Sequence, residues 1–218
     1  YITGTSMGAL VGSLYASGYT PNEIERFFTS DEFLDMSRGV IQQEHIFYYQ
    51  RVQEDAGLIR LKFSQDSILR PKLPTNLIDP AAIDYQLAES LGLSSIAAHN
   101  DFDSLYIPFR CVSADIASKK TVVFSSGNLS EAVRASMSYP FYLKPIRVNG
   151  TLMFDGGLYN NFPADVMCSD FNPDFVIGSS VAASLEPPSE DDPLSQIRNM
   201  MMARTNYNID CKNSIIIT

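Results

Sequence analysis

The chain has 218 residues, of which 45% are hydrophobic and 19% are charged. This balance is typical of a folded domain and excludes a disordered or fibrous chain. The length suits a single domain with its own core. No run of about 18 apolar residues occurs, so the sequence predicts no membrane-spanning helix.

The charge balance excludes one class of partner. The chain carries 16 basic and 25 acidic residues, which gives a net charge of -9, and no cluster of Lys and Arg interrupts this excess. Nucleic acid is therefore not an expected partner, because binding to phosphates needs a basic surface. The same charge opposes docking on anionic lipid, although an apolar patch would still permit peripheral membrane contact.

The three cysteines are Cys111, Cys168 and Cys211. They are too few and too widely separated for a disulfide framework or a zinc site, and the odd count leaves at least one unpaired within the chain. We expect core residues or free thiols.

The first elements are marked by small residues and caps. Residues 1–4 resemble the end of a strand, so we expect the chain to begin inside a fold, with any signal peptide upstream. Small residues over 7–17 favour a helix packed closely on a sheet, and Gly18 would cap it. Residues 20–23, Thr-Pro-Asn-Glu, form a capping box that opens a second helix toward Phe28.

The middle of the chain contains one clear helix. Residues 31–75 lack periodicity and predict loops, short helices and a strand at 58–63. Asp79 and Pro80 then mark the start of an amphipathic helix, whose apolar residues recur every fourth position before Gly92. Its apolar face would be formed by Ile83, Leu87 and Leu91.

Strand and helix patterns continue to the end of the chain. Strands are predicted at 105–114 and 121–124, and a helix from Asn128 to about Met137. Asn149 and Gly150 predict a type I′ hairpin that leads the chain into Asp155. The remaining predictions are strands at 175–181 and 214–217 and an acidic, proline-rich loop at 187–193. Alternating helices and strands favour one α/β domain with a largely parallel sheet.

The strongest motif is Gly4-Thr5-Ser6-Met7-Gly8, a G-x-S-x-G pattern between the predicted strand end and helix. This is the context of a nucleophile elbow, in which the glycines leave room for a sharp turn so that the serine hydroxyl projects. The Met7 amide, at the positive end of the helix, would donate to a developing oxyanion. The alternative is a chance match, which the strand-to-helix context disfavours.

A nucleophilic serine needs a base, and the usual partner is a histidine. The chain has two, His45 in an aromatic stretch and His99 in a polar run typical of a surface loop. Neither is framed by glycines that would present it to a site, so a structural or solvent-exposed role is favoured for both. A Ser-His-Asp esterase that uses His99 is kept as an alternative.

Asp155 is better placed to act as the base. It follows the apolar residues 152–154 and precedes Gly156 and Gly157, which permit a sharp turn. Desolvation raises the pKa of a carboxylate and makes it a stronger base, so Asp155 would accept the serine proton directly. Without the serine motif, Asp-Gly-Gly would indicate only a surface turn.

Together these two motifs resemble the signature of the patatin-like phospholipases, which are known for a Ser-Asp dyad. Residues 9–19 are similar to the segment that follows the elbow in bacterial members. Residues 132–140, Ala-Val-Arg-Ala-Ser-Met-Ser-Tyr-Pro, are similar to the block before the family's aspartate. The resemblance extends from residue 1 to about residue 181.

The resemblance implies a three-layer α/β/α sandwich that hydrolyses acyl esters of phospholipids or related lipids, with no metal or cofactor. Ser6 would form an acyl-enzyme, and Asp155 would take its proton and later activate the water that releases the fatty acid. Asn160 and Asn161 match polar residues that trail the family's aspartate and would support the site. Likeness to bacterial members favours a role in the cell envelope or outside the cell, without excluding the cytoplasm.

The family also carries a glycine-rich loop ahead of the elbow, whose amides complete the oxyanion hole. Residues 1–218 are therefore expected to form a single patatin-like catalytic domain without its first strand and this loop. Loss of such donors costs about 10²- to 10³-fold in rate. The alternative from another class is a non-catalytic lipid- or protein-binding domain of the same fold.

Overall fold

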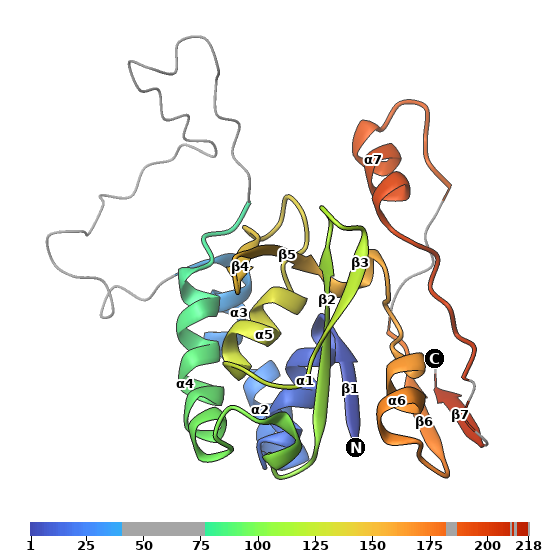
Figure 1. Ribbon diagram of the computed structural model, residues 1–218. Coiled ribbons are helices and arrows are strands. Elements are labelled where there is room, and N and C mark those ends of the chain that lie inside the picture. Colours follow the sequence, from blue (N-terminus) through green and yellow to red (C-terminus); the bar gives the residue numbers. More distant parts are fainter. Residues whose placement is uncertain (41–76, 182–186, 210, 212, 218) are drawn as a thin grey trace, which may run out of the picture.

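The computed structural model describes residues 1–40, 77–181, 187–209, 211 and 213–217 (Figure 1). Strands and helices alternate along these ranges, as expected for the α/β class. The strand predicted at 58–63 lies outside the described residues. No helix within the ranges is both long and apolar enough to cross a bilayer.

Strand β2 is the central strand of the main sheet, because three other strands pair with it. The five strands are β1 (Ile2–Thr5), β2 (Phe109–Asp115), β3 (Lys120–Phe124), β4 (Ile146–Val148) and β5 (Thr151–Asp155). β1 pairs with β2 in parallel, whereas β3 and β5 pair with β2 in antiparallel orientation, and β4 pairs with β5 in the same way. A second, two-stranded parallel sheet contains β6 (Val176–Ser179) and β7 (Ser214–Ile217).

The central sheet is therefore mixed, and parallel pairing is found only at β1–β2 and β6–β7 among the described strands. Short turns account for two departures from the largely parallel expectation, the antiparallel β2–β3 and β4–β5 pairs, because only antiparallel strands can be joined by a few residues. The antiparallel β2–β5 pair forms between strands that are distant in the sequence. The β4–β5 turn has positive φ at Asn149 (50°) and Gly150 (82°), as the predicted type I′ hairpin requires.

Helices cover both faces of the central sheet, which gives the three-layer α/β/α arrangement (Figure 1). α1, α4 and α5 lie on one face, and α6 lies on the other beside β1. The described helices are α1 (Met7–Ala16), α2 (Pro21–Phe28), α3 (Asp31–Arg38), α4 (Ala81–Ala97), α5 (Leu129–Ser136), α6 (Ala164–Phe171) and α7 (Pro193–Met201). Within the described ranges the short 3₁₀ helices are η4 (Phe102–Ser104) and η5 (Gly156–Leu158).

The predicted helix starts are confirmed by their caps. Thr20 and Glu23 form the expected capping box at α2, and the Asn128 side chain accepts a hydrogen bond from the Glu131 amide at α5. The predicted helix after Pro80 is α4, which continues past Gly92 to Ala97. Tertiary packing outweighs the helix-weakening effect of one glycine here, because α4 buries residues on both sides of that point.

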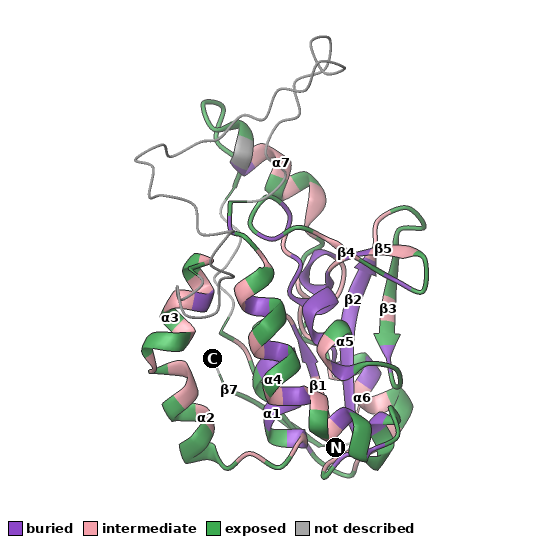
Figure 2. Ribbon diagram, turned by 90° about the vertical axis from the view of Figure 1, so that its left-hand side faces the viewer, coloured by how far each residue is buried: buried purple, intermediate pink, exposed green. Residues whose placement is uncertain are grey.

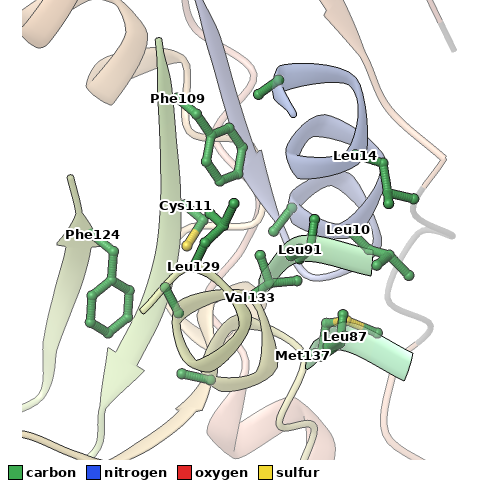
Figure 3. Close-up of a cluster of buried hydrophobic side chains, with 14 of the residues drawn as sticks. Leu10, Leu14, Leu87, Leu91, Phe109, Cys111, Phe124, Leu129, Val133 and Met137 are labelled. Carbon is green, nitrogen blue, oxygen red and sulfur yellow. The ribbon is translucent and has the colours of Figure 1, made fainter. Parts of the chain in front are cut away.

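The main core lies between the sheet and the helices on its α1 side (Figure 3). Leu10 and Leu14 of α1 pack there with Leu87 and Leu91 of α4, and all four side chains are at most 2% exposed. Figure 2 shows the burial along the strands and the inner faces of these helices. At Gly12 a β-carbon would press against Ile2 and Phe109, so the predicted close helix–sheet approach is confirmed there.

The cysteine expectation is corrected in part. Cys168 and Cys211 form a disulfide, with a Cα–Cα separation of 5.6 Å, whereas Cys111 is a free, fully buried core residue. The two partners are 43 residues apart in the sequence. Their pairing arises because β7 returns beside β6, which follows α6 directly, and spacing alone does not predict such a return.

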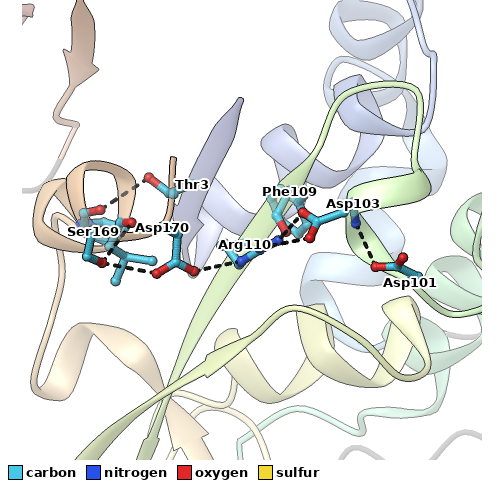
Figure 4. Close-up of polar contacts among 9 residues, drawn as sticks. Thr3, Asp101, Asp103, Phe109, Arg110, Ser169 and Asp170 are labelled. Carbon is cyan, nitrogen blue, oxygen red and sulfur yellow. Dashed lines mark hydrogen bonds and ion pairs between the residues drawn. The ribbon is translucent and has the colours of Figure 1, made fainter. Parts of the chain in front are cut away.

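One buried cation ties the second helical layer to the sheet (Figure 4). The Arg110 side chain on β2 donates to Asp170 at 2.8 Å and to Asp103 at 2.7 Å, and it stacks over the Phe171 ring. Asp170 and Phe171 belong to α6, whereas Asp103 belongs to η4. Arg110 therefore fixes α6 against the strand that neighbours β1.

Candidate active site

The register of the sheet brings the two motif turns together. β1 pairs with residues 109–112 of β2, and β5 pairs with residues 113–115. β3 overlaps both registers, so it occupies one edge of β2, and β1 and β5 share the other. Because β1 runs with β2 and β5 runs against it, their carboxyl ends meet, with Thr5 and Asp155 opposite adjacent residues of β2.

Ser6 occupies a strained turn between β1 and α1. Its φ of 54° and ψ of -118° are unusual for a residue with a side chain. The turn is held by the Ser6 amide, which donates to Ser136 Oγ at 2.9 Å, and by the Ser6 carbonyl, which accepts from the Ala9 and Leu10 amides. At Gly4 a β-carbon would collide with the Gly8 carbonyl, so this glycine is needed for the turn.

Asp155 is in direct hydrogen-bond contact with Ser6. Its carboxylate is 3% exposed and accepts two hydrogen bonds, from Ser6 Oγ to Oδ2 at 2.7 Å and from the Gly157 amide to Oδ1 at 2.7 Å. Its own amide donates to the Ser138 carbonyl. A β-carbon at Gly156 would collide with the Val112 carbonyl, so the chain turns here only without a side chain.

Burial makes Asp155 an unusually basic carboxylate. Desolvation raises its pKa from the ordinary 3.8 to about 6, and the hydrogen bonds from Ser6 and Gly157 oppose this rise. No Lys, Arg or His forms an ion pair with Asp155 among the residues that the structure describes. The carboxylate is therefore set up to accept a proton from the one hydroxyl that it contacts.

The start of α1 supplies a backbone donor in the residue after Ser6. The Met7 amide finds no acceptor within the described part of the chain, and it lies at the positive end of the helix. Gly8, by contrast, has open space where a β-carbon would stand, so the expected steric need for glycine is absent at this position in the described residues.

Two concave regions are relevant to this pair, because Ser6 lines the first and Leu158, three residues after Asp155, lines the second. The first, called here the strand groove, has a volume of about 440 Å³ and is lined by residues 1–8, residues 161–164, Met167 and residues 176–181. The second, called here the apolar pocket, has a volume of about 300 Å³. It is lined by Leu77, Tyr139, Pro140, Phe141, Tyr142, Leu158, Asp192, Ser195, Ile197, Arg198, Met201 and Met202.

The family can be assigned from a comparison of the sequence with known families. A model described as Patatin-like phospholipase matches residues 1–167, a span that contains both turns. The chain belongs to the patatin-like phospholipase family. The resemblance seen in its motifs is thereby confirmed, and the family name implies lipid acyl hydrolysis.

Similar proteins are found in bacteria and mammals. An uncharacterised NTE family protein of Mycobacterium tuberculosis is 27% identical over 190 residues, which are 87% of this chain and 43% of that protein. A second one from the same organism is 45% identical over 62 residues, or 28% of this chain and 11% of that protein. The mouse patatin-like phospholipase domain-containing protein 7 is 32% identical over 102 residues, 46% of this chain and 7% of that protein. The chain spans less than half of each relative.

Sequence reasoning did not single out the residues that support this patatin-like site from α5. Ser136 is fully buried and bridges the Ser6 amide and the Val112 carbonyl, to which it donates at 2.6 Å. Arg134 is 3% exposed and donates to Ser138 Oγ, to Asp84 and to the Lys144 carbonyl. Both belong to the family-like block at 132–140, which was the one available signal.

Asn160 and Asn161 lie close to the two turns and contact residues near Ser6 and Asp155. Thr5 Oγ1 donates to the Asn160 carbonyl at 2.9 Å, and Asn160 Nδ2 donates to Asp165. Asn161 lines the strand groove and contacts the position that a β-carbon on Gly157 would occupy. These contacts fit a supporting role.

The histidine alternative gains no geometric support. His99 is exposed at the carboxyl end of α4, with φ of 52°, while the Ser6 hydroxyl is already bonded to Asp155. His45 lies outside the described residues. Within the described ranges no group of three or more His, Cys, Asp and Glu side chains is arranged to hold a metal ion.

Proposed function

We propose that the full-length protein is a lipid acyl hydrolase in which Ser6 is the nucleophile and Asp155 the base. The observation that carries the proposal is the 2.7 Å hydrogen bond from Ser6 Oγ to the buried Asp155 carboxylate. A hydroxyl within this distance of a base of raised pKa meets the geometric requirement for activation. Membership of the patatin-like phospholipase family supports the acyl ester of a lipid as substrate.

The reaction follows from these two side chains. Asp155 accepts the Ser6 proton as Oγ attacks the ester carbonyl, and the resulting tetrahedral species carries its charge on the former carbonyl oxygen. Collapse breaks the ester bond, and Asp155 returns the proton to the departing alcohol, leaving an acyl-enzyme. Asp155 then takes a proton from water, the hydroxide attacks the acyl carbon, and the proton passes back to Ser6 as the fatty acid leaves.

The developing oxyanion needs donors. The Met7 amide supplies one, and the strand groove is the place for a second. Among the described strands, β1 pairs with β2 alone and β6 with β7 alone, so each leaves one edge unpaired, and residues of β1 and β6 line this groove. An unpaired edge accepts a further strand. We assign the groove to the family's first strand, whose glycine-rich loop would bring its amides to Ser6.

A serine-reactive fluorophosphonate probe tests the assignment in the full-length protein. Ser6→Ala should abolish labelling, and Asp155→Asn should slow it strongly, because the base is lost while the fold is kept. His99→Ala should leave it unchanged. Labelling that survives Ser6→Ala would remove Ser6 as the nucleophile, and loss of labelling in His99→Ala would favour the Ser-His-Asp alternative.

The non-catalytic alternative is distinguished by turnover. A lipid- or protein-binding domain would leave the ester intact, whereas the hydrolase releases fatty acid from phospholipid vesicles or micelles. Fatty acid release by the full-length protein, absent in Ser6→Ala, supports the hydrolase. Binding without release by the wild-type protein would favour the non-catalytic domain.

A further inference from the structure

The apolar pocket is lined by residues on both sides of the Asp155 turn in the sequence, Tyr139 before it and Leu158 after it, and α7 forms one of its walls. Figure 1 shows α7 beyond the ends of the central strands. Ile197 and Met201 of α7, and Met202 just after it, line the pocket together with Tyr139 and Leu158. A volume of about 300 Å³ is at the lower end of the range for small-molecule sites, about 300–1,000 Å³.

Both walls are joined to the catalytic turn by backbone hydrogen bonds. On one side, the Asp155 amide donates to the carbonyl of Ser138, the residue before Tyr139. On the other, the Ala203 amide, just after α7, donates at 2.7 Å to the carbonyl of Leu158, which ends η5. The pocket is therefore anchored within three residues of Asp155 along two separate segments.

The chemistry of the lining suits a flexible hydrocarbon. Methionine, leucine, isoleucine and aromatic side chains dominate it, and the Tyr139 hydroxyl meets Met202 Sδ at 3.7 Å. Methionine adapts to irregular apolar ligands because its side chain is unbranched and polarisable. The charged members are Asp192 and Arg198, both exposed.

The strand groove differs in kind, because residues of β1 and β6 line it and each of these strands has one edge that pairs with no other described strand. Unpaired amides and carbonyls need hydrogen-bond partners, which a hydrocarbon cannot provide. Of the two concave regions, only the apolar pocket offers a lining without this demand.

We propose that the apolar pocket holds the acyl chain of the ester attacked by Ser6, so that side chains of α7 set the preferred chain length. This inference rests on the proposed function, because the acyl carbon must reach Ser6. It assigns substrate selection to a helix beyond residue 167, where the family match ends.

Two tryptophan substitutions on α7 test the proposal in the full-length protein. Met201→Trp fills the pocket, whereas Met200→Trp adds the same bulk at a neighbouring side chain that is 77% exposed and does not line it. The measurement is kcat/KM for p-nitrophenyl acetate, octanoate and palmitate. Met201→Trp should lower the palmitate-to-acetate ratio of kcat/KM about tenfold or more, while Met200→Trp keeps the wild-type ratio.

An unchanged chain-length profile in Met201→Trp, with acetate turnover and thermal unfolding like those of wild type, would overturn the proposal. If the wild-type protein hydrolyses no ester, the proposed function fails. Fatty-acid binding then tests whether the pocket accepts a hydrocarbon chain. Fluorescence of cis-parinaric acid with Ser6→Ala then serves as the readout. An affinity about tenfold weaker with Met201→Trp added, but not with Met200→Trp, keeps the pocket as a fatty-acid site, and equal affinities exclude it.

Discussion

The turn at Ser6 and the turn at Asp155 meet at one edge of β2, yet they are built for opposite purposes. The Ser6 turn holds a non-glycine residue at φ 54° and leaves the residue partly exposed, as the proposed nucleophile requires. The Asp155 turn has an ordinary φ of -51° and leaves the residue 3% exposed. One turn uses backbone strain to present a group, and the other uses burial to make a group basic.

In the proposed mechanism the two turns contribute different properties to the reaction. Ser6 owes its position to local bonds from α1 and Ser136, whereas Asp155 owes its raised pKa to removal from water. A direct Ser-Asp pair needs both, because an ordinary carboxylate is too weak a base to replace an imidazole.

The largest expected effect comes from removing the base and keeping its shape. Asp155→Asn should lower kcat/KM for lipid ester hydrolysis by about 10³- to 10⁴-fold, as loss of a proton acceptor does in related triads. The measurement is fatty acid release by the full-length protein. Asp191→Asn, at an exposed loop position, is the matched control and should retain wild-type turnover. Equal activity in Asp155→Asn would contradict the role of this turn.

The two glycines of the Ser6 motif should respond in opposite ways. Gly4→Ala places a methyl group against the Gly8 carbonyl and should lower the free energy of unfolding by about 3 kcal/mol or more. Gly8→Ala meets open space in the first turn of α1 and should leave stability equal or up to about 1 kcal/mol higher. Urea unfolding of both variants checks the contrast, and similar losses would show that the steric argument is wrong.

The buried carboxylate should also lower stability at neutral pH. Because the folded-state pKa of Asp155 lies above its ordinary value, the folded protein holds this proton more tightly, and that stabilisation is lost as the pH rises from about 4 to about 6. Asp155→Asn should therefore raise the free energy of unfolding by about 2–3 kcal/mol at pH 8 and much less at pH 4. Denaturant titrations at the two pH values measure this, and a gain that is independent of pH would refute the linkage.

The smallest effects are expected from substituting the serines whose hydrogen bonds support the two turns. Ser136→Ala removes the bond to the Ser6 amide and the bond to the Val112 carbonyl, so a loss of about 1–3 kcal/mol and slower fluorophosphonate labelling are expected. Ser113→Ala removes a bond to the Phe154 carbonyl on β5, and it should cost stability with little change in labelling per folded molecule. Equal labelling in both variants would show that Ser136 does not position Ser6.

Local patterns in the sequence predicted the elements on which the site depends. The small-residue helix after Ser6, the capping box at Thr20 and the hairpin at Asn149 all follow from steric and capping preferences of a few adjacent residues, and each is present. For the same reason, the turn at Asp155 follows an apolar strand, as residues 152–157 predict.

Features that depend on pairing between distant residues were not predictable. The shared edge of β2 requires the register of three strands, and the Cys168–Cys211 disulfide requires β7 to return beside β6. The support from Ser136 depends on a bond across 130 residues. A hydrophobic or turn pattern specifies the local conformation of a segment but not its neighbour, so these contacts become visible only in the fold.

The most direct test of the account is the pH dependence of Ser6 labelling by a fluorophosphonate in the full-length protein. Asp155 must be deprotonated to act as base, so the rate should fall about tenfold per pH unit below about pH 6 and level off above it. His99→Ala should show the same curve. A rate controlled by a group that titrates near the ordinary carboxylate pKa of 3.8, or a midpoint that disappears in His99→Ala, would contradict the claim that a buried, basic Asp155 activates Ser6.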